Sequence, residues 1–261
     1  MKIIFIRHGE PDYSCDSLTE KGKREADILA KRTALWDVDD IYVSPFGRAK
    51  ETAAPTLSAL SKEATELSWL REFSYQVTSP VVDAPSVPWD FIPSVLYGDE
   101  RLLSEDEWIT APPMDGNSDI KENYPKVIAG LDELIEKYGY ERKGKYYVRK
   151  DGCERFIKST VTDMKFATID MIEDNPDEKT IVVFCHLGVI CLMLSHLLNI
   201  PFESLTHGFF LPTTSVTIVN TEERWGSEVS FRVQAMGDCT HLIKEGEPIS
   251  NAGSFAKTFQ D

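Results

Sequence analysis

Three strand-like runs in this 261-residue chain each end abruptly in polar or titratable side chains. They are KIIFI (2–6), DDIYV (39–43) and TIVVFC (180–185), and a helix-like stretch follows each one. Continuous apolar strands are typical of a parallel sheet that helices cover on both faces. Two later runs, 215–220 and 229–236, predict further strands. The sequence therefore predicts an α/β fold, a three-layer sandwich with a mainly parallel central sheet flanked by helices.

Helix signals follow the first two strands. Residues 17–36 place small and apolar side chains on one helical face, as expected of a helix packed on a sheet. Ser44 is predicted to cap the next helix, since Pro45 is favourable at a first helical position. We expect Pro55 to bend that helix or end it early, because proline lacks the backbone N–H that a helix interior needs.

The alternation of strand and helix is interrupted between about residues 76 and 150. Residues 78–93 are rich in proline and predict irregular structure, whereas 117–138 carry the apolar stripe of an amphipathic helix. Residues 141–152 predict a basic hairpin, whose cations fit a solvated surface better than a handle for a second anionic group. We expect a single domain, residues 1–261, with a cap-like insertion at about 76–150.

The charge of the chain limits its partners. Its formal net charge is −15 and its pI is about 4.8, which argues against nucleic acid or an anionic membrane surface as a partner. An anionic small molecule must therefore be bound by a local cluster of cations, against the overall field. Nothing in the sequence predicts an oligomeric state.

The cysteines and the longest apolar segment indicate a cytoplasmic protein. The cysteines are Cys15, Cys153, Cys185, Cys191 and Cys239. Their odd number and the lack of a CxxC pair predict free thiols in a reducing compartment. Residues 181–200 are long enough to span a membrane, but their polar residues divide them into a strand and a helix. The apolar run before Arg7 is too short for a signal peptide.

The polar residues that follow the three strands predict one shared crevice. Arg7 and His8 end the first strand, Arg48 follows the second, and His186 ends the third. In a parallel α/β sheet, ligands bind beyond the carboxyl ends of the strands. Adjacent strand residues point to opposite faces, so Gly9 must let the chain turn if both Arg7 and His8 face the crevice.

Two arginines in one pocket suit an anion with several oxygens. Guanidinium groups bind phosphate in bidentate fashion, and the first helical turn that holds Arg48 also favours an anion. A histidine among these positive charges has a lowered pKa and stays neutral, as a nucleophilic imidazole must. The chemistry then requires an acid that protonates the leaving oxygen.

These residues belong to a longer series of ordered motifs. The motifs are Arg7-His8-Gly9-Glu10, Leu18-Thr19 with Gly22 and Ala26, Ser44-Pro45-x-x-Arg48-Ala49-x-x-Thr52-Ala53, Leu70-Arg71-Glu72, Phe184-Cys185-His186-x-Gly188-Val189, Leu211-Pro212 with Ser215-Val216, and His241-Leu242. In this order the chain resembles the histidine phosphatase superfamily, in its phosphoglycerate-mutase-like branch. The likeness extends over residues 5–242, and the insertion falls where members carry a cap.

The resemblance implies a role for each residue of the crevice. His8 would be the nucleophile that becomes phosphorylated, while Arg7, Arg48 and His186 would hold the equatorial phosphoryl oxygens. Glu72 would protonate the leaving alkoxide and then activate water. Two arginines and a histidine can supply the positive charge, so no metal or cofactor is expected. The expected activity is that of a metal-independent phosphomonoesterase acting on a small phosphorylated metabolite through phosphohistidine.

Some of these roles have competitors. The carboxyl groups that could replace Glu72 are Asp12, Asp16 and Asp83. His196 lies on an apolar helix and is expected to be a satisfied core histidine, whereas His207 and His241 are expected to have structural or supporting roles. Trp89 and Trp108 could line a substrate pocket, although such residues more often anchor an insertion to the core.

Two other functions stay open at this point. A phosphoglycerate-mutase-type isomerase would share every catalytic residue. Mutases, however, follow RHGE with a tryptophan-asparagine segment and place a glycine-bearing segment just after the acid. This chain has Pro11-Asp12-Tyr13-Ser14 and Phe73-Ser74-Tyr75-Gln76 at those places. The other alternative is a catalytically silent phosphate-binding regulatory module, which intact chemical positions do not favour. The insertion would recognise the substrate, but it contains no motif that indicates which substrate this is.

Overall fold

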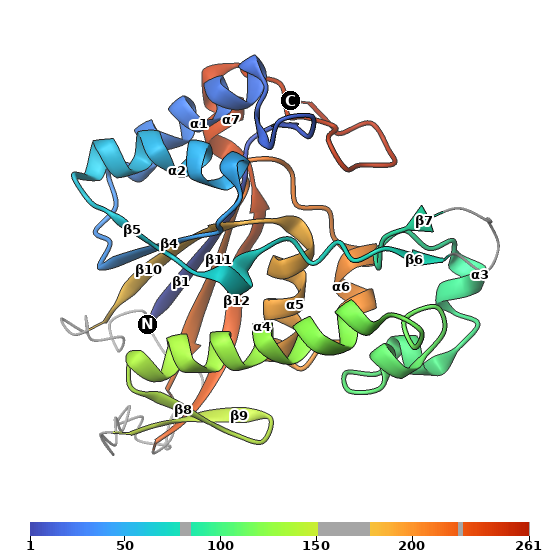
Figure 1. Cartoon of the computed structure of the whole chain (residues 1–261). Helices are drawn as coiled ribbons and strands as arrows, with labels where there is room; N and C mark the ends of the chain where they lie inside the picture. The colour runs from blue at the N-terminus through green and yellow to red at the C-terminus, as the bar shows by residue number, and fades with distance from the viewer. Residues whose placement is uncertain (79–84, 151–177, 224–226, 261) are drawn as a thin grey trace, which may run out of the picture.

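An eight-stranded sheet forms the centre of the molecule, and helices cover both of its faces (Figure 1). The computed structural model describes residues 1–78, 85–150, 178–223 and 227–260. In spatial order the strands are β5 (Ala64–Glu66), β4 (Asp40–Val43), β10 (Thr180–Cys185), β1 (Lys2–Arg7), β11 (Val216–Glu222), β12 (Glu228–Asp238), β9 (Tyr146–Arg149) and β8 (Tyr140–Lys143). The predicted α/β sandwich is confirmed.

The parallel half of the sheet is buried on both faces. Strands β5, β4, β10 and β1 run parallel, and β11 joins β1 in the antiparallel direction. On β1, Ile3 and Phe5 pack into the larger hydrophobic cluster, whereas Ile4 and Ile6 pack into a smaller one on the opposite face. This alternation explains why the strand is apolar at every position.

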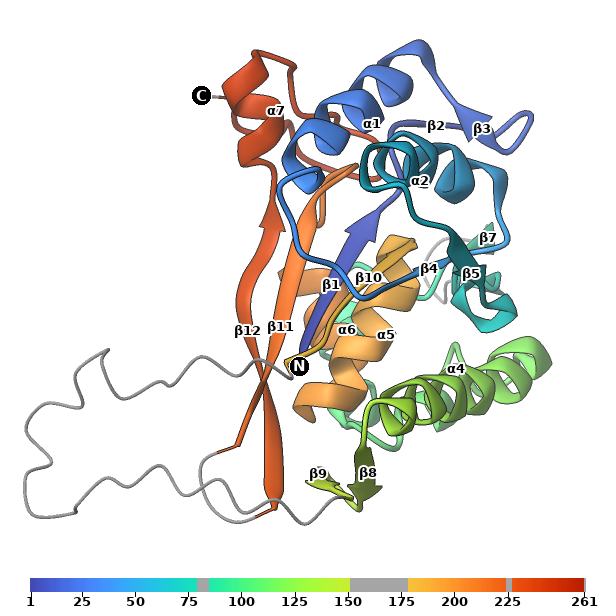
Figure 2. The same cartoon turned by 90° about the vertical axis from the view of Figure 1, so that its left-hand side faces the viewer.

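The helices divide between these two clusters. They are α1 (Glu20–Thr33), α2 (Gly47–Leu60), α3 (Pro93–Leu96), α4 (Ser118–Lys137), α5 (Leu187–Leu198), α6 (Phe202–Gly208) and α7 (Thr240–Glu245). Helices α1 and α2 cover one face, α4 and α5 lie on the other, and α7 packs beside α1 (Figures 1 and 2). The predicted helix in 17–36 and the amphipathic helix in 117–138 are thereby confirmed.

Helix α2 differs from the prediction at both of its ends. Its N-cap residue is Phe46, so the predicted cap at Ser44 is wrong, and the Ser44 hydroxyl instead contacts His186. The helix also continues through Pro55 to Leu60. Its buried face, which includes Ala53, packs in the smaller cluster. Packing of this kind outweighs the hydrogen bond that one proline removes.

Residues 76–150, predicted to be an insertion, contain strands as well as helices. Strands β6 (Val77–Thr78) and β7 (Pro85–Ser86) form a short ribbon, and β8 and β9 form the predicted hairpin. Strand β9 pairs with β12 and so extends the central sheet. The Met1 amine donates to Tyr140 Oη across 3.3 Å, which places the hairpin at the amino end of β1, away from Arg7 (Figure 2).

The apolar segment 181–200 divides as predicted into β10 and α5. Among the described residues, no helix is both long and apolar enough to cross a membrane. Three of the predicted free thiols, Cys185, Cys191 and Cys239, are buried, and Cys15 is exposed. Cys153 lies outside the described residues.

Candidate active site

The structure brings Arg7, His8, Arg48 and His186 together at the carboxyl ends of β1, β4 and β10. The two imidazole rings lie with their centroids 5.1 Å apart. The Phe46 ring contacts two members of this group: its centroid lies 5.2 Å from that of the His186 ring and 4.6 Å from Arg48 Cζ. Residues from three distant segments of the sequence thus form one buried cluster at the predicted site of the crevice.

His8 is buried and hydrogen-bonded through its Nδ1. Its Nδ1 lies 2.7 Å from the Gly9 carbonyl oxygen. Because a carbonyl can only accept, Nδ1 carries the proton and Nε2 is unprotonated in the neutral ring. Burial, and then the charges of Arg7 and Arg48, hold the pKa of His8 well below its usual range. The result is a neutral imidazole whose Nε2 can act as a nucleophile.

His186 is fully buried and contacts the protein through one ring nitrogen. Its Nε2 lies 2.7 Å from Ser44 Oγ. Its Nδ1 is buried and has no hydrogen-bond partner in the part of the chain that the structure describes. Burial and the neighbouring His8 and arginines lower the pKa of His186 well below its usual range. This ring is therefore also neutral.

Arg7 is held by two backbone carbonyls. Its Nη1 donates to Leu211 O across 2.6 Å, and its Nη2 donates to Ala252 O across 3.0 Å. The Leu211-Pro212 motif therefore has a structural role, since it supplies one of these acceptors. Gly253 has a φ of +81°, and a Cβ there would lie only 3.0 Å from Arg7 Nη2. Arg7 Nε is buried and finds no acceptor among the described residues.

Arg48 lies in the first turn of α2 and pairs with a carboxylate of the chain. Its Nη1 lies 2.5 Å from Asp16 Oδ1, and the Gly47 N–H donates to Asp16 Oδ2 across 2.7 Å. The helix N-terminus that was expected to help hold a ligand anion therefore binds Asp16. A Cβ at Gly47 would lie 2.2 Å from Asp16 O, so only glycine fits there. Arg48 Nε is buried and lacks a partner in the described ranges.

Glu72 is docked at the start of α5. Its Oε1 accepts from the backbone N–H of Phe73 across 2.8 Å and of Val189 across 3.2 Å. Burial raises the pKa of Glu72, although both hydrogen bonds and the charges of Arg7 and Arg48 oppose the shift. A carboxyl group in this state can hold a proton at mildly acidic pH and donate it.

Trp89 reaches this place from the insertion. A Cβ on Gly188 would lie 2.3 Å from the Trp89 ring and 2.8 Å from Glu72 Oε1, so Trp89 and the acid both lie against Gly188. Trp108, by contrast, is fully buried and packs on Phe202, 4.7 Å between ring centroids. Of the two tryptophans, one lies beside the crevice and the other anchors the insertion.

Two of the competing carboxyl groups have hydrogen-bond partners of their own, and the third is not described. Asp12 accepts from the backbone and hydroxyl of Ser14, and Asp16 pairs with Arg48 as given above. Asp83 lies outside the described residues. His196 Nε2 lies 2.9 Å from Asp132 Oδ1, which confirms the expected satisfied core histidine.

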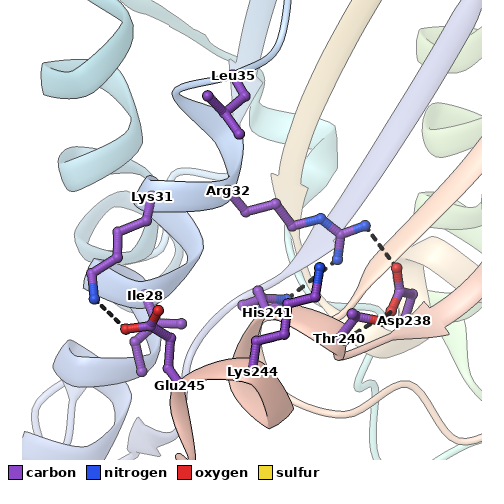
Figure 3. Close-up of a pocket in the computed structure, with 9 residues that line it drawn as sticks. All are labelled: Ile28, Lys31, Arg32, Leu35, Asp238, Thr240, His241, Lys244 and Glu245. Carbon is purple, nitrogen blue, oxygen red and sulfur yellow. Dashed lines mark hydrogen bonds and ion pairs between the residues drawn. The ribbon is translucent and has the colours of Figure 1, made fainter.

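A pocket of about 340 Å³ lies elsewhere, between α1 and α7 (Figure 3). Its lining residues are Ile28, Lys31, Arg32, Leu35, Asp238, Thr240, His241, Lys244 and Glu245. Arg32 bonds both Asp238 and His241 here. His241 Nε2 lies 3.3 Å from Thr214 Oγ1, and the Thr214 N–H bonds the carbonyls of Arg7 and His8. His241 thus supports the chain behind the crevice without entering it.

His207 is paired with a buried acid on its own helix. Its Nδ1 lies 3.3 Å from Glu203 Oε2, and burial raises the pKa of Glu203 to about 7. The His207 ring stacks on Phe91 at 6.0 Å. Within the described ranges, no group of three or more histidine, cysteine, aspartate or glutamate side chains could hold a metal ion.

Several contacts of the crevice were missed by sequence reasoning. The contact of Arg7 with the Ala252 carbonyl involves a backbone group, so no residue type in the sequence indicates it. The sequence indicates Asp16 as an alternative acid and Ser44 as a helix cap and a motif residue, but it does not predict their contacts with Arg48 and His186. Trp89 and Trp108 look alike in the sequence, since both are tryptophans in an irregular segment. The glycine at position 47, before Arg48, is the one local feature that indicates a close approach by another segment.

Comparisons with known proteins identify the family of the chain. The pattern of the histidine phosphatase superfamily (branch 1) matches residues 3–79 and 117–233. A probable phosphatase of Schizosaccharomyces pombe is 24% identical over 259 residues, which cover 94% of this chain and 97% of that protein.

Solved structures share the fold. A mutant phosphoserine phosphatase from Entamoeba histolytica, in complex with phosphoserine, is 20% identical with a TM-score of 0.56, over 92% of this chain and 98% of that one. A mycobacterial glucosyl-3-phosphoglycerate phosphatase is 15% identical with a TM-score of 0.55, over 90% and 98% of the two chains. The sequence pattern, which matches well over half of the residues, and the shared architecture together place the chain in the histidine phosphatase superfamily.

Proposed function

We propose that the chain is a metal-independent phosphomonoesterase that acts on a small phosphorylated metabolite through a phosphohistidine on His8. Family membership and the names of its relatives support a phosphatase. The observation that carries the finer proposal is a set of three unpaired nitrogens on neighbours of His8. Arg7 Nε, Arg48 Nε and His186 Nδ1 are all buried without a partner among the described residues, and a phosphoryl group would satisfy them.

The reaction would proceed in two balanced steps. His8 Nε2 attacks phosphorus and forms a P–N bond, while the P–O bond to the leaving group breaks and Glu72 gives its proton to that oxygen. Glu72 then takes a proton from water, the water oxygen attacks phosphorus, and His8 leaves as a neutral imidazole. Arg7, Arg48 and His186 would hold the phosphoryl oxygens in both steps, which is how phosphoryl transfer is mainly catalysed.

An exposed arginine beside the crevice favours substrates that carry a second acidic group. Arg71 is exposed, and its Cζ lies 5.4 Å from the Phe46 ring, beside the ring that also contacts Arg48 and His186. No carboxylate of the described residues pairs with it. Two relatives are named for phosphoserine and for glucosyl-3-phosphoglycerate, both of which carry a carboxylate. These two compounds are therefore the first substrates to test. A cytoplasmic location, argued above from composition, is part of the same proposal.

Hydrolysis of p-nitrophenyl phosphate in excess EDTA tests the proposal. The wild type should retain its activity, and His8→Ala should lose it. His196→Asn is the matched control, because His196 is another partly buried histidine that lies outside the crevice and should leave kcat/KM within about threefold. Rapid quenching should also trap an acid-labile, alkali-stable phosphoenzyme in the wild type. Loss of activity in EDTA, or an active His8→Ala, would contradict the proposal, and 3-phosphoglycerate isomerisation would support the mutase instead.

A further inference from the structure

We infer that Ser44 is a positioning residue: its hydroxyl fixes His186 in the tautomer that carries the ring proton on Nδ1, ready to donate to the transferred phosphoryl group. The inference rests on the proposed function for its catalytic meaning. The tautomer of His186 is inferred from the hydrogen bonds of Ser44 and does not depend on the proposed function.

The argument begins with the partners of the Ser44 hydroxyl. Ser44 is fully buried, and its Oγ has two neighbours within hydrogen-bond distance, His186 Nε2 at 2.7 Å and the Phe46 N–H at 3.3 Å. The Phe46 N–H can only donate, so it uses a lone pair of Oγ. The hydroxyl proton then has one acceptor among the described residues, which is His186 Nε2. A buried hydroxyl that does not donate would leave its proton unsatisfied.

An Nε2 that accepts a hydrogen bond is unprotonated, and this determines the rest of the ring. The pKa of His186 is lowered, so the ring is neutral and has a single proton, which must then lie on Nδ1. Nδ1 is the buried nitrogen that lacks a partner in the described part of the chain. A protonated Nδ1 would donate to a phosphoryl oxygen, whereas an unprotonated one would direct a lone pair at it.

The two histidines have the same tautomer but different roles, one as a nucleophile and the other as a hydrogen-bond donor. His8 uses its Nδ1–H on the Gly9 carbonyl, which leaves the Nε2 lone pair for attack. His186 uses its Nε2 lone pair on Ser44, which leaves the Nδ1–H for donation. One hydrogen bond to each ring therefore separates a nucleophile from a donor at a centroid distance of 5.1 Å.

Nitrogen NMR of the full-length protein tests the tautomer directly. Long-range ¹H–¹⁵N correlations of ¹⁵N-labelled imidazoles distinguish a protonated from an unprotonated nitrogen, and a His186→Asn spectrum assigns the resonances. The wild type should show a protonated Nδ1 and an unprotonated Nε2 in His186. Ser44→Ala should shift this ring to a mixture of tautomers. A wild-type His186 protonated on Nε2, or a tautomer that Ser44→Ala leaves unchanged, would overturn the inference whether or not the protein hydrolyses any substrate.

Kinetics test whether the tautomer matters. Ser44→Ala should lower kcat/KM for p-nitrophenyl phosphate by about 10- to 100-fold and weaken vanadate inhibition, while Ser44→Thr, which keeps the hydroxyl, should restore most of both. If Ser44→Ala unfolds, Ser44→Cys provides a weak donor of similar size. A mixed tautomer with unchanged kcat/KM would overturn the positioning role. An inactive wild type with the expected tautomer would contradict the proposed function only.

Discussion

The crevice at the strand ends and the pocket of Figure 3 contain similar side chains, but these differ in whether their polar atoms have partners. Each has a buried, neutral histidine and at least one arginine. In the pocket, Arg32 pairs with Asp238 and His241, and Lys31 pairs with Glu245. In the crevice, Arg7 Nε, Arg48 Nε and His186 Nδ1 have no partner among the described residues. A cluster of unsatisfied buried polar atoms is therefore a better indication of a ligand-binding site than a cavity alone.

The two places also differ in electrostatics. In the pocket, Asp238 and Glu245 pair with two of the three lining cations. The pKa of His241 falls to about 4 mainly through burial, with Arg32 adding to the shift and Asp238 opposing it. In the crevice, arginines add to burial at both His8 and His186. In a chain with a net charge of −15, Asp16 pairs with Arg48, but no carboxylate of the described residues forms an ion pair with Arg7, which bonds backbone carbonyls instead.

Arginine removal gives the largest contrast between the two places. Arg48→Ala should lower kcat/KM for p-nitrophenyl phosphate by about 10³-fold and weaken inhibition by vanadate and phosphate, because it removes a buried donor to the developing charge. Arg32→Ala, the matched change in the pocket, should leave kcat/KM within about threefold. Steady-state kinetics with vanadate titrations measure both. Equal effects of the two changes would remove Arg48 from the phosphate site.

Glutamate replacement gives a smaller and more selective effect. Glu72→Gln should slow an alkyl phosphate by about 10²-fold and p-nitrophenyl phosphate far less, because nitrophenolate leaves without a proton. Glu203→Gln is the matched control, since Glu203 is also buried with a raised pKa but lies on α6. Equal slowing of both esters by Glu72→Gln would assign the acid role to another group.

The pH profile of the alkyl phosphate reaction sharpens the same contrast. The pKa of His8 is lowered, so the nucleophile stays neutral below its ordinary 6.5, and the pKa of Glu72 is raised, so the acid stays protonated above its ordinary 4.5. The value of kcat/KM should therefore be largest on the acidic side of neutrality and fall as Glu72 ionises. Glu72→Gln should remove that fall, and a decline that persists in this variant would contradict the assignment.

The parts of the site that follow directly from strand ends could be predicted. Arg7, His8 and His186 come at the ends of apolar runs, and the carboxyl ends of parallel strands share one edge. The assignment of Glu72 depended on resemblance, because no local pattern predicts that its carboxylate accepts a hydrogen bond from the first turn of α5. Burial on both faces is encoded locally in such apolar strands, so the sandwich was predictable as well.

The contacts that could not be predicted join segments far apart in the chain. Ser44 obeys the local rule for a helix cap, yet its partner is His186, 142 residues away. Arg7 is held by the Ala252 carbonyl, 245 residues away, and a carbonyl is present at every position of any sequence. Pro55 also follows a local rule that packing overrides. Tertiary partners decide these cases, and the sequence does not state them.

The smallest expected effect on activity comes from His241, which should affect stability instead. Its folded pKa of about 4 lies below the ordinary 6.5, so the unfolded chain binds its proton first as pH falls. His241 therefore weakens stability progressively between pH 6.5 and 4, by about 3 kcal/mol in all. His241→Asn should show a flatter loss of unfolding free energy over that range in urea titrations, with kcat/KM within about threefold of the wild type. A large loss of activity with an unchanged slope would mean that the pocket takes part in the chemistry, and the contrast between the two places would fail.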